Sequence, residues 1–222
     1  MGRPETNWAR RLAMNVLGNG LHFAGQYADA LSVKQAKLAM ERRLGADEDT
    51  ILGVQANLAM SYGALGHREK ALSMERDVYS GRLKLNGEED SDTLSAGINY
   101  ALSLGCLGRF EEARSLLRKT MPVARRVLGE SNETTLRMRW IYAEALYRDD
   151  ATLDDLREAV NTLEETERTA RRVFGGAHPI TAGMGKALRK ARAALRAREE
   201  AAPDDVSSVC KGVAAMTPPG DA

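Results

Sequence analysis

Residues 107–136 read LGRFEEARSLLRKTMPVARRVLGESNETTL, and the order of turn and helix signals in this stretch recurs along the chain. Gly108 forms a turn, a helix carrying Glu112 and Ala113 follows it, and Gly129 ends that helix before a new one begins near Thr135. Glycine ends helices because it alone adopts a left-handed conformation without steric cost. The stretch therefore predicts helices joined antiparallel by short turns.

Four kinds of marker share one period along the chain. Helix-ending glycines lie 42, 42 and 46 residues apart, at Gly45, Gly87, Gly129 and Gly175. Turn glycines are 41 and 42 residues apart, at Gly25, Gly66 and Gly108. Alanines recur at intervals of 41, 42 and 46 residues, at Ala30, Ala71, Ala113 and Ala159. Threonines recur at intervals of 43, 42 and 46 residues, at Thr50, Thr93, Thr135 and Thr181. A fixed period of this length is typical of repeat proteins, in which each unit packs on its neighbours.

Each unit is interpreted as a pair of antiparallel helices. Leu94, Ile98, Ala101 and Leu104 keep helical spacing in the stretch between Thr93 and the next turn glycine. The hydroxyls of Thr50, Thr93 and Thr135 are expected to cap the first helices of their units. The predicted fold is all-α, a right-handed α-solenoid of about four helix pairs with a C-terminal capping helix and no strands.

The predicted repeat domain covers residues 5–200, and residues 201–222 are expected to be a disordered tail. Its repeats span about 5–45, 50–87, 93–129 and 135–175, with the capping helix at 180–200. The fourth unit has four extra residues within 148–155 and lacks a turn glycine. We interpret this insertion as a longer turn that ends in a helix cap at Thr152.

Composition excludes several classes of protein. The 32 Lys and Arg residues balance 31 Asp and Glu residues, so the whole molecule has no electrostatic preference for nucleic acid or membranes. Two cysteines, Cys106 and Cys210, form no disulfide framework, and Cys106 lies on an apolar helix face typical of the core. Without a transmembrane segment or signal peptide, the expected location is the cytoplasm.

The motifs resemble the tetratricopeptide repeats of kinesin light chains in their 42-residue form. That family's unit reads T-L-x-x-x-N-N-L-A, then G-K/R-Y-x-E-A, then L-G-x-x-H-P. The matching segments are Asn57-Leu58-Ala59, Asn99-Tyr100-Ala101, Gly25–Ala30, Gly108–Ala113 and Phe174–Pro179. The resemblance covers roughly Trp8–Glu200 and implies a binding scaffold, although Arg68 replaces the turn aromatic and Trp140–Ala143 replaces the asparagine motif. A heptad coiled coil, through which a light chain joins its heavy chain, is not present.

Such a superhelix binds extended or helical peptides on a concave face lined by its first helices. Helical periodicity places five polar residues on that face, and we expect them to contact a protein or peptide partner: Asn57, Ser61, Asn99, Ser103 and Arg137. Asparagine amides can pair with a peptide backbone of any sequence. The alternative is that these residues are only solvated. Self-association through the open N-terminal repeat face is a further possibility.

Other repeat positions are predicted to be structural, because small residues allow two helices to approach closely. They are Gly25, Ala30, Ala59, Gly66, Ala71, Ala101, Gly108, Ala113, Ala143 and Ala159. An enzyme is not predicted, because no nucleophile motif or phosphate-binding loop is found. His22 and His67 lie on neighbouring units, too far apart to share a metal, so neither metal nor cofactor is expected.

The last helix suggests an alternative function. Its basic residues lie opposite Ala187, Leu188, Ala191 and Leu195, and they are Lys186, Arg189, Lys190, Arg192, Arg196 and Arg198. A basic amphipathic helix can bind an anionic membrane or RNA. The competing interpretation is a capping helix whose charged face keeps the end of the stack in water.

Overall fold

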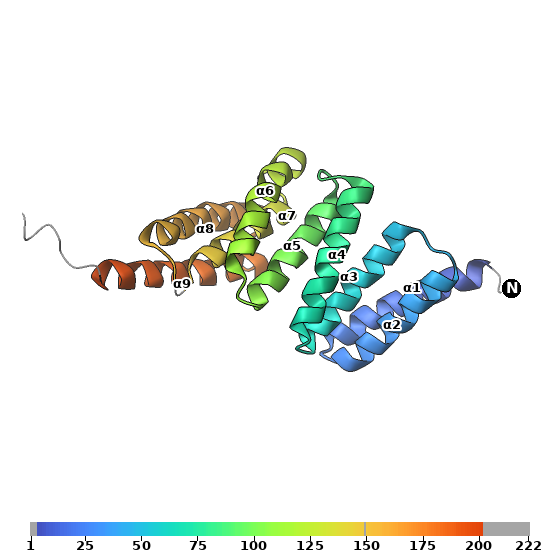
Figure 1. Cartoon of the computed structure of the whole chain (residues 1–222). Coiled ribbons are helices and arrows are strands. Elements are labelled where there is room, and N and C mark those ends of the chain that lie inside the picture. Colours follow the sequence, from blue (N-terminus) through green and yellow to red (C-terminus); the bar gives the residue numbers. More distant parts are fainter. Residues whose placement is uncertain (1–3, 149, 202–222) are drawn as a thin grey trace, which may run out of the picture.

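The computed structural model describes residues 4–148 and 150–201, and within them the chain forms nine α-helices and no strand. Figure 1 shows these helices as an extended row, with α1 at one end and α9 at the other. Their bounds are α1 Pro4–Phe23, α2 Tyr27–Arg43, α3 Glu48–Ala64, α4 Arg68–Asn86, α5 Ser91–Cys106, α6 Phe110–Leu128, α7 Glu133–Leu146, α8 Leu153–Phe174 and α9 Pro179–Ala201. The predicted helical repeat architecture is confirmed.

Each helix packs on the next one in the chain, so the odd-numbered helices are the first members of successive pairs. Helix α7 also contacts α5 and α9, whereas α4, α6 and α8 make no comparable contacts with one another within the described residues. Elements on the inside of a curved row lie closer together than those on the outside. In the C-terminal half of the row, α5, α7 and α9 therefore line the inner face, and α6 and α8 line the outer face.

The predicted turn glycines have left-handed backbones, with φ of 78° at Gly25, 84° at Gly66 and 75° at Gly108. The glycines that end α4, α6 and α8 also have positive φ, between 83° and 87°. A side chain at any of these positions would strain the backbone. The glycine period therefore marks the helix ends correctly.

The predicted threonine caps are wrong by three residues. The side chains of Asp47 and Asp90 cap α3 and α5, accepting hydrogen bonds from the backbone N–H of Thr50 and Thr93 at 2.7 and 2.9 Å. Asn132 caps α7 in the same way. Carboxylates are favoured here because they also interact with the positive end of the helix dipole.

Two of the three threonines, Thr93 and Thr135, are buried instead, and Thr50 is half-buried. Thr93 and Thr135 are at most 1% exposed, and the Thr135 hydroxyl donates to the carbonyl of Ala124 on α6 at 3.3 Å. Thr152, in contrast, is a cap as predicted. Its hydroxyl accepts from the Asp155 N–H while the Asp155 carboxylate accepts from the Thr152 N–H, which forms a capping box.

The structural alanines of the repeat are all buried, from 0% to 3% exposed: Ala30, Ala59, Ala71, Ala101, Ala113, Ala143 and Ala159. The main hydrophobic cluster runs from α4 to α9 and includes Leu94, Leu117 and Leu163. A second and smaller cluster joins α2, α3 and α4. The core is thus larger in the C-terminal half of the row.

The residue at one core position of each repeat explains why the core is smaller in the N-terminal half of the row. Four residues after the repeat alanine, the four units carry Lys34, Glu75, Leu117 and Leu163. Lys34 is 4% exposed, and its ammonium donates to the Ser61 hydroxyl and the Asn57 carbonyl, both at 3.0 Å. Glu75 is 2% exposed, and its Oε2 has no hydrogen-bond partner within the described residues. Burial raises the pKa of Glu75 to about 8.

Replacing Ala101 with leucine is expected to destabilise the protein, because Ala101 is 0% exposed in the main hydrophobic cluster and a larger side chain there must displace its neighbours. Overpacking of this kind costs roughly 1–3 kcal/mol. The measurement is the free energy of unfolding in urea, with Ala193→Leu on the exposed side of α9 as the matched control. Equal effects of the two substitutions would show that the assigned helix register is wrong.

Helix α9 ends at Ala201, so the first residue assigned to the tail is helical. The rest of the predicted tail, including Cys210, lies outside the described residues.

Candidate functional site

Helices α3, α5 and α7 position the predicted groove residues. Asn57 and Asn99 occupy equivalent places on α3 and α5, and both are half-buried. The Asn57 amide donates to the Gly53 carbonyl at 3.2 Å. The Asn99 side chain makes no hydrogen bond within the described part of the chain, so its amide is available to a ligand. Arg137 on α7 lies 3.8 Å from Glu133, a loose ion pair at the surface.

Ser61 does not fit the predicted groove. It is 0% exposed and is covered by Lys34, whose ammonium is hydrogen-bonded to it. Its hydroxyl stabilises a buried cation and does not face solvent, so we remove Ser61 from the groove. Ser103, one repeat later, is half-buried and stays among the candidate groove residues.

A small cavity of about 180 Å³ lies between α5 and α7. Leu102 and Cys106 line it three and seven residues after Asn99, and Ile141 lines it from α7. At the edge of this cavity, the guanidinium of Arg148 lies 4.6 Å from the ring centroid of Phe110. Cys106 is exposed, so the expectation that it belongs to the core is wrong.

The first helix has an uncovered apolar face. Five large apolar side chains along α1 are between 47% and 85% exposed: Trp8, Leu12, Val16, Leu17 and Phe23. Leu12 and Val16 precede Gly53 and Asn57 by one repeat, so this face continues the row of first helices. Association of two copies through this end of the row stays a prediction.

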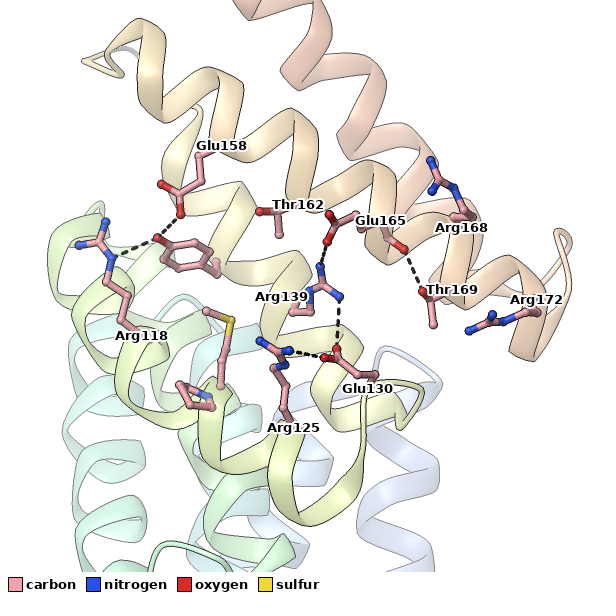
Figure 2. Close-up of a pocket in the computed structure, with 13 residues that line it drawn as sticks. Arg118, Arg125, Glu130, Arg139, Glu158, Thr162, Glu165, Arg168, Thr169 and Arg172 are labelled. Atoms are coloured by element: carbon pink, nitrogen blue, oxygen red, sulfur yellow. Dashed lines mark hydrogen bonds and ion pairs between the residues drawn. The ribbon is translucent and has the colours of Figure 1, made fainter.

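A cavity of about 560 Å³ lies between α6 and α8 (Figure 2). We call it the arginine groove, after its five arginines: Arg118, Arg125, Arg139, Arg168 and Arg172. Tyr142 and Arg139 of α7 form part of its lining, whereas Ile141 of the same helix faces the small cavity. The arginine groove therefore lies on the opposite side of α7 from the predicted inner groove.

Ion pairs fix the middle of the arginine groove. Glu130 lies 2.5 Å from Arg125 and 3.6 Å from Arg139, and Arg139 also lies 2.6 Å from Glu165. Figure 2 shows these four side chains as a chain of contacts across the groove. The Arg139 side chain is 17% exposed, so its two carboxylates compensate a largely buried cation.

A tyrosine connects two other charged groups of the groove. The Tyr142 hydroxyl donates to Glu158 at 2.7 Å and accepts from Nε of Arg118 at 3.1 Å. Burial raises the pKa of Tyr142, and the hydrogen bond to Glu158 raises it further. The hydroxyl therefore stays protonated at neutral pH.

Sequence reasoning did not find the arginine groove. Its residues come from three helices, and only the packing of α6 and α8 across α7 brings them together. One signal was available, because Arg139 occupies the position of Gly97 in the preceding unit. A large cation that replaces glycine at a repeat position marks a place where one unit differs from the others.

The histidines pack against aromatic rings. The His22 ring centroid lies 5.2 Å from that of Tyr27, and the His67 centroid lies 6.0 Å from that of Tyr62. In residues 4–148 and 150–201, no group of three or more His, Cys, Asp or Glu side chains could hold a metal ion. Among the same residues, every helix is too short or too polar to cross a membrane.

The apolar side of α9 is used for packing. Met184, Ala187, Leu188 and Ala191 are buried, and α9 contacts both α7 and α8. An interfacial helix needs this face to enter a membrane, so the structure does not favour the membrane alternative. Arg192 pairs with Glu164 and Arg198 donates to the Ala151 carbonyl, both at 2.7 Å, and the other four basic residues are exposed: Lys186, Arg189, Lys190 and Arg196. A capping role accounts for this arrangement.

These helix pairs form a tetratricopeptide-like repeat fold. Residues 51–92 and 93–133 each match the family model of the tetratricopeptide repeat. The predicted resemblance to kinesin light chain-type repeats is confirmed.

Two solved structures with the same fold are similar to this chain. One contains the nearly identical TPR-like repeats of a candidate kinesin light chain from Podosopora anserina, with a TM-score of 0.69 and 21% identity over 90% of this chain and 92% of that one. The other is BtubC (BKLC) from P. vanneervenii, with a TM-score of 0.64 and 18% identity over 94% of this chain and 83% of that one. At these identities the similarity establishes the fold alone. No curated protein sequence matches the chain.

Proposed function

We propose that this protein is a non-catalytic interaction scaffold, which binds a peptide segment of a partner protein along its inner face. Tetratricopeptide repeats are generally protein–protein interaction modules. One observation carries the assignment to the inner face. The half-buried amide of Asn99 has no hydrogen-bond partner in the described chain, and Asn99 lies one helical turn before Leu102, which lines the small cavity between α5 and α7.

The chemistry of this face suits a peptide. A side-chain amide offers both a donor and an acceptor, so it can pair with a backbone peptide group. The cavity lined by Leu102, Phe110 and Ile141 can accept one apolar side chain. Arg148, which lines this cavity, and Arg137 on α7 can contact acidic groups that flank the bound side chain.

Replacing both Asn57 and Asn99 with alanine is expected to weaken partner binding about tenfold, which corresponds to the loss of about 1.4 kcal/mol. The partner is first captured on the immobilised chain and identified, and its Kd is then measured by titration calorimetry. The melting temperature should stay unchanged, because neither side chain bonds to another helix.

The matched control is Asn161→Ala, which removes an exposed asparagine from α8. Equal affinities for the Asn57/Asn99 double variant and the native chain would refute the assignment of the inner face.

A further inference from the structure

We propose that the arginine groove is a second binding site, which takes an acidic peptide segment whose carboxylates pair with arginines on α6, α7 and α8. The site lies on the opposite side of α7 from the inner face and does not depend on the function proposed above.

Five arginines face three glutamates in this groove. Arg125 and Arg139 share the carboxylates of Glu130 and Glu165. The other three arginines have no carboxylate within ion-pair distance among the described residues: Arg118, Arg168 and Arg172. Arg118 uses its Nε on the neutral Tyr142 hydroxyl. Unpaired guanidinium groups around one cavity make it a site for anions.

The arginines are spread along the groove. Figure 2 shows Arg118 at one end, Arg125 and Arg139 beside Glu130 in the middle, and Arg172 at the other end. A single small anion could contact only one of these places. A peptide with several carboxylates can contact all of them, since each guanidinium pairs with a carboxylate through two parallel hydrogen bonds.

The floor of the groove is already ordered. Tyr142 is 5% exposed and is held between Arg118 and Glu158, while Arg139 is held by two carboxylates. Side chains fixed before binding lose little conformational entropy when a ligand arrives. Met121 and Pro122 add an apolar wall against which the stem of a bound side chain can pack.

The equivalent groove one unit earlier does not have this character. The repeat intervals place Leu83, Gly97 and Pro122 where the arginine groove has Arg125, Arg139 and Arg168. They also place Leu116 and Val123 where it has Thr162 and Thr169.

In that earlier unit the Tyr79 ring fills the space above Gly97, and a Cβ added to Gly97 would lie 3.4 Å from it. A cavity in the same unit, lined by Arg76 and Tyr100, is about 120 Å³. The arginine groove is therefore a feature of the third and fourth units, and it does not follow from the repeat fold itself.

The test uses the full chain and a fluorescein-labelled peptide of alternating glutamate and glycine, titrated by fluorescence anisotropy at ~0.15 M salt. Arg168→Ala/Arg172→Ala is the main variant, because both side chains are exposed and unpaired, so the fold should not change. It is expected to weaken peptide binding roughly tenfold, as the loss of charge-assisted hydrogen bonds predicts. A peptide with glutamine in place of glutamate should not bind.

The matched control is Arg189→Ala/Lys190→Ala, which removes two exposed charges from α9 outside the groove. Equal losses in both double variants would mean diffuse attraction and would overturn the proposal. So would an unchanged affinity in Arg168→Ala/Arg172→Ala, or binding of inorganic phosphate or anionic vesicles in place of the peptide. Asn57→Ala/Asn99→Ala should bind the acidic peptide normally, which separates this site from the inner face.

Discussion

Replacing Glu75 with leucine is expected to stabilise the protein by about 3 kcal/mol at pH 7, an effect that follows from the raised pKa of this carboxyl group. Glu75 is 2% exposed, has an unpaired carboxyl oxygen and occupies the core position that holds leucine in the next two units. Leucine has a similar volume and removes both the charge and the unsatisfied polar atom.

The sign of the pH dependence follows from the direction of the shift. Burial raises the pKa of Glu75 from 4.5 in the unfolded chain to about 8 in the folded protein. Between these values the folded state keeps a proton that the unfolded state releases, so stability falls as the pH rises. The loss of stability caused by burying this carboxyl group is absent at pH values below 4.5, and it reaches its full size above about 8.

Urea unfolding at about pH 5, 7 and 9 measures this effect, and the advantage of the Glu75→Leu variant should grow along the series. Glu75→Gln is the matched control: it removes the ionisation but keeps an unpaired polar group, so its stability should be flatter with pH without the full gain. If the native and Glu75→Leu profiles run parallel, Glu75 is not the group that titrates.

Replacing Leu117 with alanine is expected to destabilise the protein by ~2–5 kcal/mol, the range for removing a leucine from a close-packed core. Leu117 is 0% exposed and belongs to the cluster that runs from α4 to α9. Its loss leaves a cavity between units, and each unit in a repeat array is stabilised mainly by its neighbours.

Leu85→Ala is the control for this substitution, because Leu85 is 46% exposed on the second helix of the preceding unit. It should change the free energy of unfolding by less than ~0.5 kcal/mol. Thermal and urea unfolding followed by circular dichroism measure both variants. Similar losses in the two variants would contradict the assignment of Leu117 to the core.

The helix pairs could be predicted because the residues that end each helix act through local backbone conformation. A glycine at 25, 66 or 108 ends a helix through its own backbone conformation, whatever it packs against. The caps were harder to assign, since Asp47 and Thr50 both have side chains that cap helices and lie three residues apart. Ser61 could not be predicted to be buried, because the Lys34 side chain that covers it belongs to another helix.

The candidate sites likewise divide into features set by a single helix, which could be predicted, and features set by the packing of several helices, which could not. Helical periodicity was enough to place Asn57 and Asn99 at equivalent positions of successive first helices. The arginine groove depends on how three helices pack, and no single helix shows it. A comparison of the units position by position would have shown the change from Gly97 to Arg139, although not the cavity beside it.

The buried Lys34 and Glu75 side chains give the row a weaker end and a stronger end. In a linear array, local opening spreads from the least stable unit and does not require the whole chain to unfold. Amide hydrogens of α1–α4 should therefore exchange with solvent earlier than those of α6–α8. Opening of the N-terminal end therefore leaves the packing of α6–α8, and with it the shape of the arginine groove, unchanged.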